Sequence, residues 1–217
     1  MSTQLTEAEK QYYQDRIDFA VSGWQIPAKL SRLPLWTKDK ARFGLMEETE
    51  DNRAAIETLL SMCRGKMDSP FVLLYGLPGR GKTWLAWAAG WYVILINRKQ
   101  SCYWRAAELL DALKNSFHIH ALPGEVGVPT YDSIMNYCKK VQLLILDDLG
   151  VGAGTDWSSG ILDEIVDARY SHKLATIITS NTLEIPDRIL SRCREGAVIW
   201  LRGKDYRAKE ACQNASS

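Results

Sequence analysis

Residues 71–83 read FVLLYGLPGRGKT, and this stretch decides the fold. The apolar run FVLLY is typical of a buried strand, and the pattern GxxxxGK[ST] follows it at once. Glycines let successive backbone N–H groups turn towards an anion at the positive end of the helix that the next residues predict. The alternative is a glycine-rich turn that matches by chance. Strand, loop and helix in this order favour a phosphate-binding loop, and the sequence therefore predicts nucleotide binding.

Particular side chains of the loop have predicted tasks. Lys82 is expected to bridge the β- and γ-phosphates of the nucleotide, and the Thr83 hydroxyl is expected to ligate Mg²⁺. ATP and Mg²⁺ are therefore the expected cofactors. The residues expected to contact the nucleotide in or beside the loop are Gly76, Pro78, Gly79, Arg80, Gly81, Lys82, Thr83 and Trp84.

Polar side chains also end two other apolar stretches. LLILDD at 143–148 supplies Asp147 as a partner for Mg²⁺ and Asp148 as a carboxylate that orients or deprotonates the attacking water. Asp148 has a competing interpretation as a turn residue, since Asp-Asp-Leu-Gly also ends a strand. Asn181 closes TIITSN and is expected to hold the attacking water, the alternative being a turn-forming asparagine. Ligands bind at the carboxyl edge of a parallel sheet, so these side chains are expected near the loop.

The pattern from residue 71 onwards predicts an α/β fold with a parallel sheet. Runs such as LLIL and TII are apolar throughout, which is typical of strands that helices cover on both faces. Helical patterns lie between most of the strands, at 51–64 ahead of them, and at 6–21 before the prolines at 27 and 34. The predicted strands are Phe71–Tyr75, Ser101–Trp104, Leu143–Leu146, Thr176–Ser180 and Ala197–Leu201.

Composition excludes several classes of protein. The 217 residues carry 27 Lys+Arg against 26 Asp+Glu, a net charge of +1, which excludes a polybasic binder. The 5 cysteines form no CxxC pair, so we expect reduced thiols, no zinc site and a cytoplasmic location. His118 and His120 lack the partners of a metal site. The start of the chain lacks a secretory signal pattern, and the apolar run 84–96 is too short for a membrane span, so no membrane partner is expected.

The ordered segments GLPGRGKT, LLILDDLG, ILDEIVDARYSHKLATIITSN and ILSRCREGAVIWLRGKDYR resemble the DnaC/IstB clade of AAA+ ATPases. The likeness covers about 50–207. It implies a three-layer core around a five-stranded parallel sheet of order 5-1-4-3-2, without a C-terminal helical lid domain and with a short, mostly helical N-terminal extension. The expected division is a partner-binding segment at 1–50, an ATPase domain at 51–207 and a flexible tail at 208–217.

The resemblance also implies roles for single residues. The GLPGRGKT segment matches the Walker A motif, Asp147 and Asp148 match Walker B, and Asn181 matches sensor 1. Arg192 matches an arginine finger that acts on a neighbouring subunit, which implies self-association, and Arg207 matches a sensor-2-like arginine that contacts the nucleotide. Both arginines could instead be ordinary surface residues. The residues expected to act in catalysis are Lys82, Asp148, Asn181 and Arg192.

The resemblance leaves alternatives for function. The first is an ATP-hydrolysing loader that binds a hexameric replicative DNA helicase and single-stranded DNA. The second is an IstB-like transposition regulator that binds double-stranded DNA and a transposase, and the third is a non-hydrolysing, nucleotide-gated adaptor. Asp148 replaces the more usual glutamate of this motif, which favours slow hydrolysis.

Some residues outside the nucleotide motifs have two interpretations. Lys114, Lys139 and Lys140 could contact single-stranded DNA or could form a solvated helix face. The tryptophans of the helix after the loop favour core packing. Trp24 and Trp36, in the proline-broken N-terminal part, are candidates for a partner-binding surface.

Overall fold

A computed structural model of the chain describes residues 49–116, 130–150 and 156–206. Several features discussed above lie outside the described residues. They are the predicted helix at 6–21, the tail at 208–217, His118, His120, Arg207, Trp24 and Trp36. Within the described parts, no helix combines the length and apolar character that crossing a bilayer requires.

Helices and strands alternate along most of the described chain, as the sequence pattern predicts. All five predicted strands are present, with ends that differ by at most one residue. The elements are α2 (Glu50–Cys63), β1 (Phe71–Tyr75), α3 (Lys82–Leu95), β2 (Ser101–Arg105), α4 (Ala106–Ser116), α5 (Tyr131–Lys140), β3 (Leu143–Asp147), α6 (Asp156–Ser171), β4 (Ala175–Ser180), α7 (Asp187–Glu195) and β5 (Ala197–Trp200).

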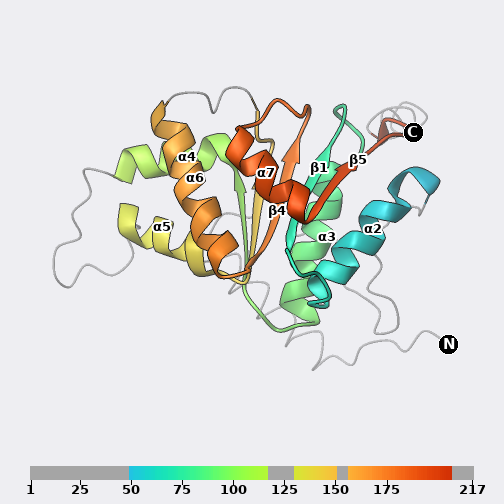
Figure 1. Ribbon diagram of the computed structural model, residues 1–217, viewed down its shortest axis with the longest axis horizontal. Helices are drawn as coiled ribbons and strands as arrows, with labels where there is room; N and C mark the ends of the chain where they lie inside the picture. The colour runs from blue at the N-terminus through green and yellow to red at the C-terminus, as the bar shows by residue number, and fades with distance from the viewer. Residues whose placement is uncertain (1–48, 117–129, 151–155, 207–217) are drawn as a thin grey trace, which may run out of the picture.

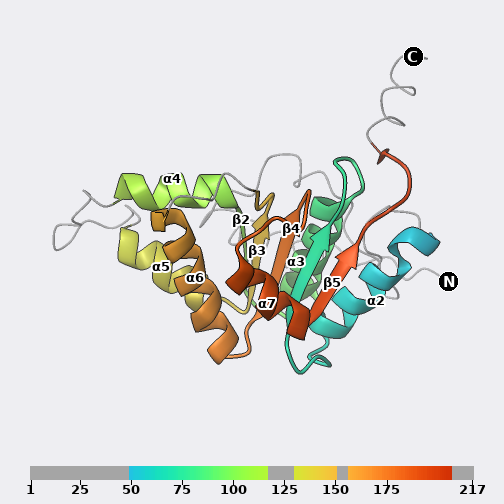
Figure 2. The same ribbon diagram turned by 45° about the horizontal axis from the view of Figure 1, so that its top comes forward.

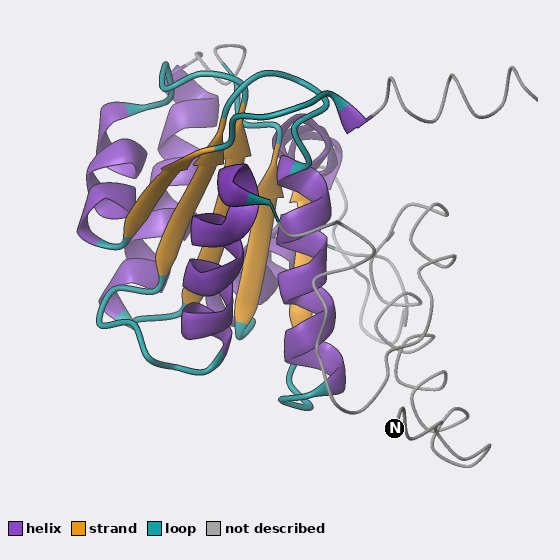
Figure 3. Cartoon of the chain, turned by 90° about the vertical axis from the view of Figure 1, so that its right-hand side faces the viewer, coloured by secondary structure: helices purple, strands orange, loops and turns teal. Residues whose placement is uncertain are grey.

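The five strands form one parallel sheet. Its order is β2-β3-β4-β1-β5, which read from the β5 edge is the expected 5-1-4-3-2. Helices α2 and α3 cover one face, and α4 to α7 cover the other (Figure 1). Figure 3 shows the strands side by side, with helices in front of them and behind them. The fold is therefore the predicted three-layer α/β core.

Side chains of β1 explain why its sequence is apolar without interruption. Phe71 and Leu73 point into the core beneath α4 to α7, whereas Val72 and Leu74 point into the core beneath α2 and α3, and all four are fully buried. Successive side chains of a strand alternate between faces, so a sheet covered on both sides needs apolar residues at every position.

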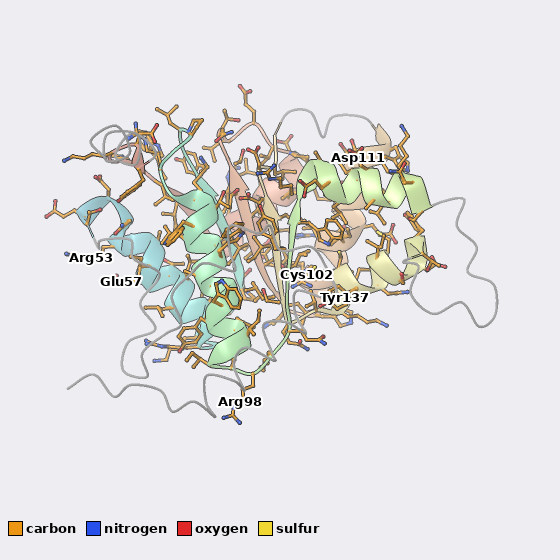
Figure 4. The ribbon with its side chains drawn as sticks, turned by 180° about the vertical axis from the view of Figure 1, so that it is seen from behind. Arg53, Glu57, Arg98, Cys102, Asp111 and Tyr137 are labelled. Carbon is orange, nitrogen blue, oxygen red and sulfur yellow. The ribbon has the colours of Figure 1, made fainter. Side chains whose placement is uncertain are left out.

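Several charged residues project from the outside of the helical layers. Arg53 and Glu57 project from α2 and Asp111 from α4, whereas Cys102 lies on β2 beside Tyr137 of α5 (Figure 4). The four cysteines in the described residues are buried and free. Cysteines in these positions act as small core residues.

Candidate functional site

The loop between β1 and α3 carries Pro78 and Arg80, and Gly81 caps α3, whose first turn begins with Lys82, Thr83 and Trp84. Gly76 has φ 142°, and a Cβ there would lie 2.4 Å from the carbonyl oxygen of Leu201. Glycine is therefore required where the end of β5 touches the loop. The first turn of α3 directs its N–H groups and its positive dipole end into the loop, as an anion site needs.

The segment after β5 lies against the same loop. Gly79 has φ 79°, and a Cβ there would meet the Asp205 carboxylate at 1.9 Å. The backbone N–H of Tyr206 donates to the carbonyl of Gly79 at 3.0 Å. The turned view shows the chain running from the tip of β5 towards this loop (Figure 2). Tyr206 is the last described residue before Arg207, so the nucleotide contact predicted for that arginine remains a prediction.

Lys82 is almost completely buried at the start of α3. Its Nζ donates to the carbonyl oxygens of Gly76 at 2.7 Å and Leu77 at 3.0 Å, and to Oδ1 of Asn181 at 2.9 Å. These contacts hold the ammonium group inside the loop and link it to the end of β4. A charge held there can meet a phosphate without moving far.

The Asp147 carboxylate, at the end of β3, accepts three hydroxyl groups. Thr83 Oγ1 lies 2.8 Å from Oδ1, Thr179 Oγ1 lies 2.6 Å from the same oxygen, and the Tyr103 hydroxyl lies 2.7 Å from Oδ2. Asp147 is 3% exposed, so these bonds offset much of the cost of burying a charge. The structure thus brings together Thr83 and Asp147, the two predicted metal ligands.

Tyr103 and Thr179 are contacts of Asp147 that sequence reasoning missed. Both lie within strands, where a lone polar residue carries no distinctive pattern. The only available signal was their place near the carboxyl ends of strands beside β3. Burial, followed by the neighbouring carboxylate, raises the pKa of the Tyr103 phenol well above its ordinary value, so the phenol stays a hydrogen-bond donor at neutral pH.

Asp148 and Asn181 are in contact, as expected for residues at one edge of the sheet. Asn181 Nδ2 donates to Asp148 Oδ1 at 3.1 Å, while its Oδ1 accepts from Lys82. Asp148 has φ 55°, a left-handed conformation that non-glycine residues rarely adopt, and its N–H donates to Thr179 Oγ1 at 2.9 Å. The backbone turns at Asp148 and exposes its carboxylate. Asp148 is therefore a turn residue, as its second interpretation predicts, and it is also in contact with Asn181.

The oxygen atoms of Thr83 and Asp147 suit a magnesium ion. Magnesium is a hard cation that prefers oxygen ligands and usually combines one or two carboxylates with substrate phosphates. Among the described residues, no cluster of three or more His, Cys, Asp or Glu side chains could hold a metal. Thr83 and Asp147 supply a hydroxyl and a carboxylate oxygen, and such ligands suit a magnesium ion that also binds substrate phosphates.

Arg192 contacts a different set of residues from those at the loop. It lies on α7, where its guanidinium pairs with Asp167 at 3.5 Å and Glu195 at 3.6 Å. The residues that meet at the loop are Lys82, Thr83, Asp147, Asp148 and Asn181. Arg192, the remaining predicted catalytic residue, lies on the helical layer formed by α6 and α7. The role of Arg192 on a neighbouring subunit remains a prediction.

The structure also shows the surroundings of the lysines of α4 and α5 and of the tryptophans of α3, which lie outside the nucleotide site. Lys139 pairs with Glu164 at 2.6 Å, a contact that agrees with the solvated-face alternative, while Lys114 and Lys140 are exposed. Trp91 is buried, and Trp87 packs edge-on against Tyr103 with ring centroids 5.3 Å apart. The helix after the loop therefore uses its tryptophans for packing.

The fold and the site together define a P-loop nucleotide-binding protein of the AAA+ type. A family model described as "IstB-like ATP binding protein" matches residues 23–211, and the chain belongs to this family. The match extends upstream and downstream of the described site, across most of the chain.

A curated relative is the replicative helicase loader DnaC of Buchnera aphidicola subsp. Baizongia pistaciae (strain Bp), which is 33% identical over 132 residues. This match covers 58% of the present chain and 51% of the relative, so the chain spans about half the length of the curated relatives that it matches.

Solved structures share the fold at lower identity. "Crystal Structure of the DnaI" is 24% identical with a TM-score of 0.61, covering 85% of this chain and 95% of that one. "Replication initiator DnaA bound to AMPPCP and single-stranded DNA" is 23% identical with a TM-score of 0.62, covering 79% and 53%. At these identities the likeness supports the AAA+ fold alone.

Proposed function

We propose that the chain binds ATP with Mg²⁺, hydrolyses it, and serves as a loader for a replicative DNA helicase. The observation that carries the ATPase part is the continuous chain of contacts Lys82–Asn181–Asp148 beside the Thr83–Asp147 pair. It joins the phosphate-binding loop to two carboxylates at one edge of the sheet. Positioning and electrostatic stabilisation are the main requirements of phosphoryl transfer, and this arrangement supplies both.

In the proposed mechanism, the loop N–H groups and Lys82 bind the phosphates. Lys82 exchanges carbonyl acceptors for phosphate oxygens and keeps its place because α3 is buried against the sheet. Thr83 and Asp147 would hold Mg²⁺. When bound, that ion neutralises charge on the β- and γ-phosphates.

Asp148 and Asn181 would act on the attacking water. The exposed Asp148 carboxylate accepts the proton or orients the water, and Asn181 fixes its position by donating to it. Asn181 also touches Lys82. One side chain therefore links the lysine that would bind the γ-phosphate to the carboxylate that would activate water. Arg192 of a second copy would then stabilise the charge of the transition state.

The helicase-loading role rests on the relatives. A protein named replicative helicase loader DnaC is 33% identical to this chain over the matched region. A DnaA structure of the same fold was solved with single-stranded DNA, and we extend that ligand class to this chain as part of the proposal. The N-terminal segment 1–50 is proposed to bind the helicase, and Arg207 to contact the nucleotide.

A second candidate function is transposition regulation. The family model is named for IstB-like proteins, which favours an ATPase that binds double-stranded DNA and a transposase. A third candidate, the nucleotide-gated adaptor, would bind ATP without hydrolysing it.

The partner is tested by co-purification of the full chain with a hexameric replicative helicase, and separately with a transposase, each with ATP and with ADP. The loader proposal predicts a nucleotide-dependent complex with the helicase. Lys82→Ala is the matched control, because it removes the lysine that is proposed to bind phosphate. Absence of helicase and of single-stranded DNA binding under every nucleotide condition would contradict the loader role, and capture of the transposase alone would support the second candidate.

A further inference from the structure

Three side chains surround the guanidinium of Arg192: Asp167, Tyr170 and Glu195, which we call the Arg192 cradle. Arg192 Nη2 lies 3.5 Å from Asp167 Oδ1, and Nη1 lies 3.6 Å from Glu195 Oε1. The guanidinium carbon sits 4.1 Å from the centroid of the Tyr170 ring, and the Tyr170 hydroxyl donates to Glu195 Oε2. Two acidic groups and one aromatic face therefore define where this arginine lies.

The cradle is fixed to the rigid core from both sides. The Tyr170 ring packs against Phe71 at the start of β1, with centroids 6.1 Å apart and an interplanar angle of 64°. On α7, the side chain of Cys193 next to Arg192 is fully buried and packs into the core. The arginine and the ring beneath it are thus held by elements that pack on the sheet itself, as a precise site requires.

The contacts orient Arg192 without using up its hydrogen-bonding capacity. Both ion pairs are longer than the roughly 2.7–2.9 Å of a charge-assisted hydrogen bond. Arg192 Nε is buried and makes no hydrogen bond. The side chain is 31% exposed, and a guanidinium carries about five N–H donors. The terminal nitrogens Nη1 and Nη2 therefore keep donors for a phosphate from outside the chain, whereas the buried Nε takes no part in this.

Asp167 is the acid that Arg188 and Arg192 of α7 share. Arg188 lies one turn before Arg192 on α7, and its Nη1 is 3.5 Å from Asp167 Oδ2. Asp163, one turn earlier on α6, pairs with Arg188 at 3.8 Å. A change at Asp163 would therefore disturb the same helix face without removing a contact of Arg192, which makes it a matched control.

We infer that Asp167 and Tyr170 are positioning residues for Arg192, and that they hold its guanidinium ready for the γ-phosphate of ATP bound to a second copy of this chain. The inference rests on the proposed function, because it assumes that Arg192 acts in trans. An arginine ordered before assembly needs no rearrangement when the second copy arrives, and a group misplaced by about 1 Å costs up to about a hundredfold in rate.

The test mixes two full-length variants that are inactive alone. Arg192→Ala keeps its loop and lacks the arginine, whereas Lys82→Ala lacks its own phosphate site and supplies the arginine. A working site needs an intact loop on one side and an intact arginine on the other, so an equal mixture is expected to recover about a quarter of wild-type turnover. Lys82→Ala, which supplies the arginine, is called the donor. Four further donors combine Lys82→Ala with one second change each: Asp167→Asn, Asp167→Glu, Tyr170→Leu or Asp163→Asn.

Asp167→Asn and Tyr170→Leu in the donor are expected to lower kcat of the mixture by about tenfold and to leave KM for ATP unchanged, since the loop belongs to the other subunit. Asp167→Glu keeps the charge and is expected to restore most of the rate. Asp163→Asn is expected to match the parent donor. A loss of folding in a donor would appear as a changed unfolding temperature, and Asp167→Glu guards against that explanation.

Equal or higher turnover with the Asp167→Asn donor would overturn the positioning role while leaving the trans arginine intact. A rise in turnover would mean that Asp167 restrains the arginine instead of positioning it. An inactive parent mixture would contradict the trans arginine itself, and the positioning role would fall with it.

Discussion

Asn181 accepts a hydrogen bond from Lys82 and donates one to Asp148, at 2.9 and 3.1 Å. One side chain therefore touches both the proposed phosphate-binding lysine and the proposed water-activating carboxylate. An amide suits the position because it offers an acceptor to a cation and a donor to an anion on adjacent atoms. A carboxylate would repel Asp148, and an aliphatic side chain would leave both partners without this link.

Asn181→Ala is predicted to bind ATP within about threefold of the wild type and to hydrolyse it about a hundredfold more slowly, because the loop and Lys82 remain while the link to Asp148 is lost. Titration with a fluorescent ATP analogue and phosphate release measure the two quantities. Thr182→Ala changes the next residue, an exposed turn position, and is expected to leave both unchanged. Wild-type hydrolysis in Asn181→Ala would remove this residue from the mechanism.

At the scale of elements, Arg169 joins α5, α6 and β4. It is fully buried on α6, and its guanidinium donates to the carbonyls of Cys138 and Val141 at the end of α5. It also donates to Thr176 Oγ1 at 2.9 Å and to the carbonyl of Ala175, both on β4. Burial lowers its pKa to about 10. The carbonyls at the end of a helix are the negative pole of its dipole and stabilise this cation.

Arg169→Met is predicted to lower the free energy of unfolding by about 2–4 kcal/mol, because several buried carbonyls lose their donors together. Thr176→Val removes one acceptor of the same arginine, and its expected cost is about 1 kcal/mol. Urea unfolding followed by circular dichroism measures both. Equal costs for the two variants would show that the carbonyl contacts contribute little.

The sequence predicts the strands, the loop and the polar residues at the strand ends, because each depends on a local pattern. Tyr103 and Thr179 could not be predicted, since their role depends on β2 and β4 lying beside β3. The Arg192 cradle is likewise invisible in sequence, because it needs the packing of α6 against α7. The strand order came from the resemblance to a known family, since parallel strands of similar composition do not specify their own neighbours.

At the scale of the whole molecule, two cores meet at one sheet, and several titratable groups are buried in them. Burial raises the pKa of the Cys63 and Cys193 thiols from 9.0 to about 12, and that of the Tyr137 phenol from 10.0 to about 12. These groups lose protons in the unfolded chain at a lower pH than in the folded chain. Their contribution to stability is therefore complete below pH 9 and is lost as the pH rises towards 12.

Between pH 8 and pH 10, the free energy of unfolding is predicted to fall by roughly 2–3 kcal/mol. Arg169 acts in the opposite direction, because its lowered pKa adds stability above about pH 10, so the measurement stays below that value. In Cys193→Ala the fall is expected to be about 1 kcal/mol smaller. Urea unfolding at a series of pH values tests this, and an identical fall in the variant would contradict it.

The central claim for the molecule is that the carboxyl edge of its sheet forms a site that binds and hydrolyses ATP. The most direct measurement compares ATP binding and phosphate release in the wild type and in Asp148→Asn, which keeps the size of the side chain and removes its charge. In Asp148→Asn, ATP affinity is expected to be unchanged and phosphate release is expected to fall about a hundredfold. Unchanged phosphate release in Asp148→Asn, or none from the wild type at any protein concentration, would contradict it.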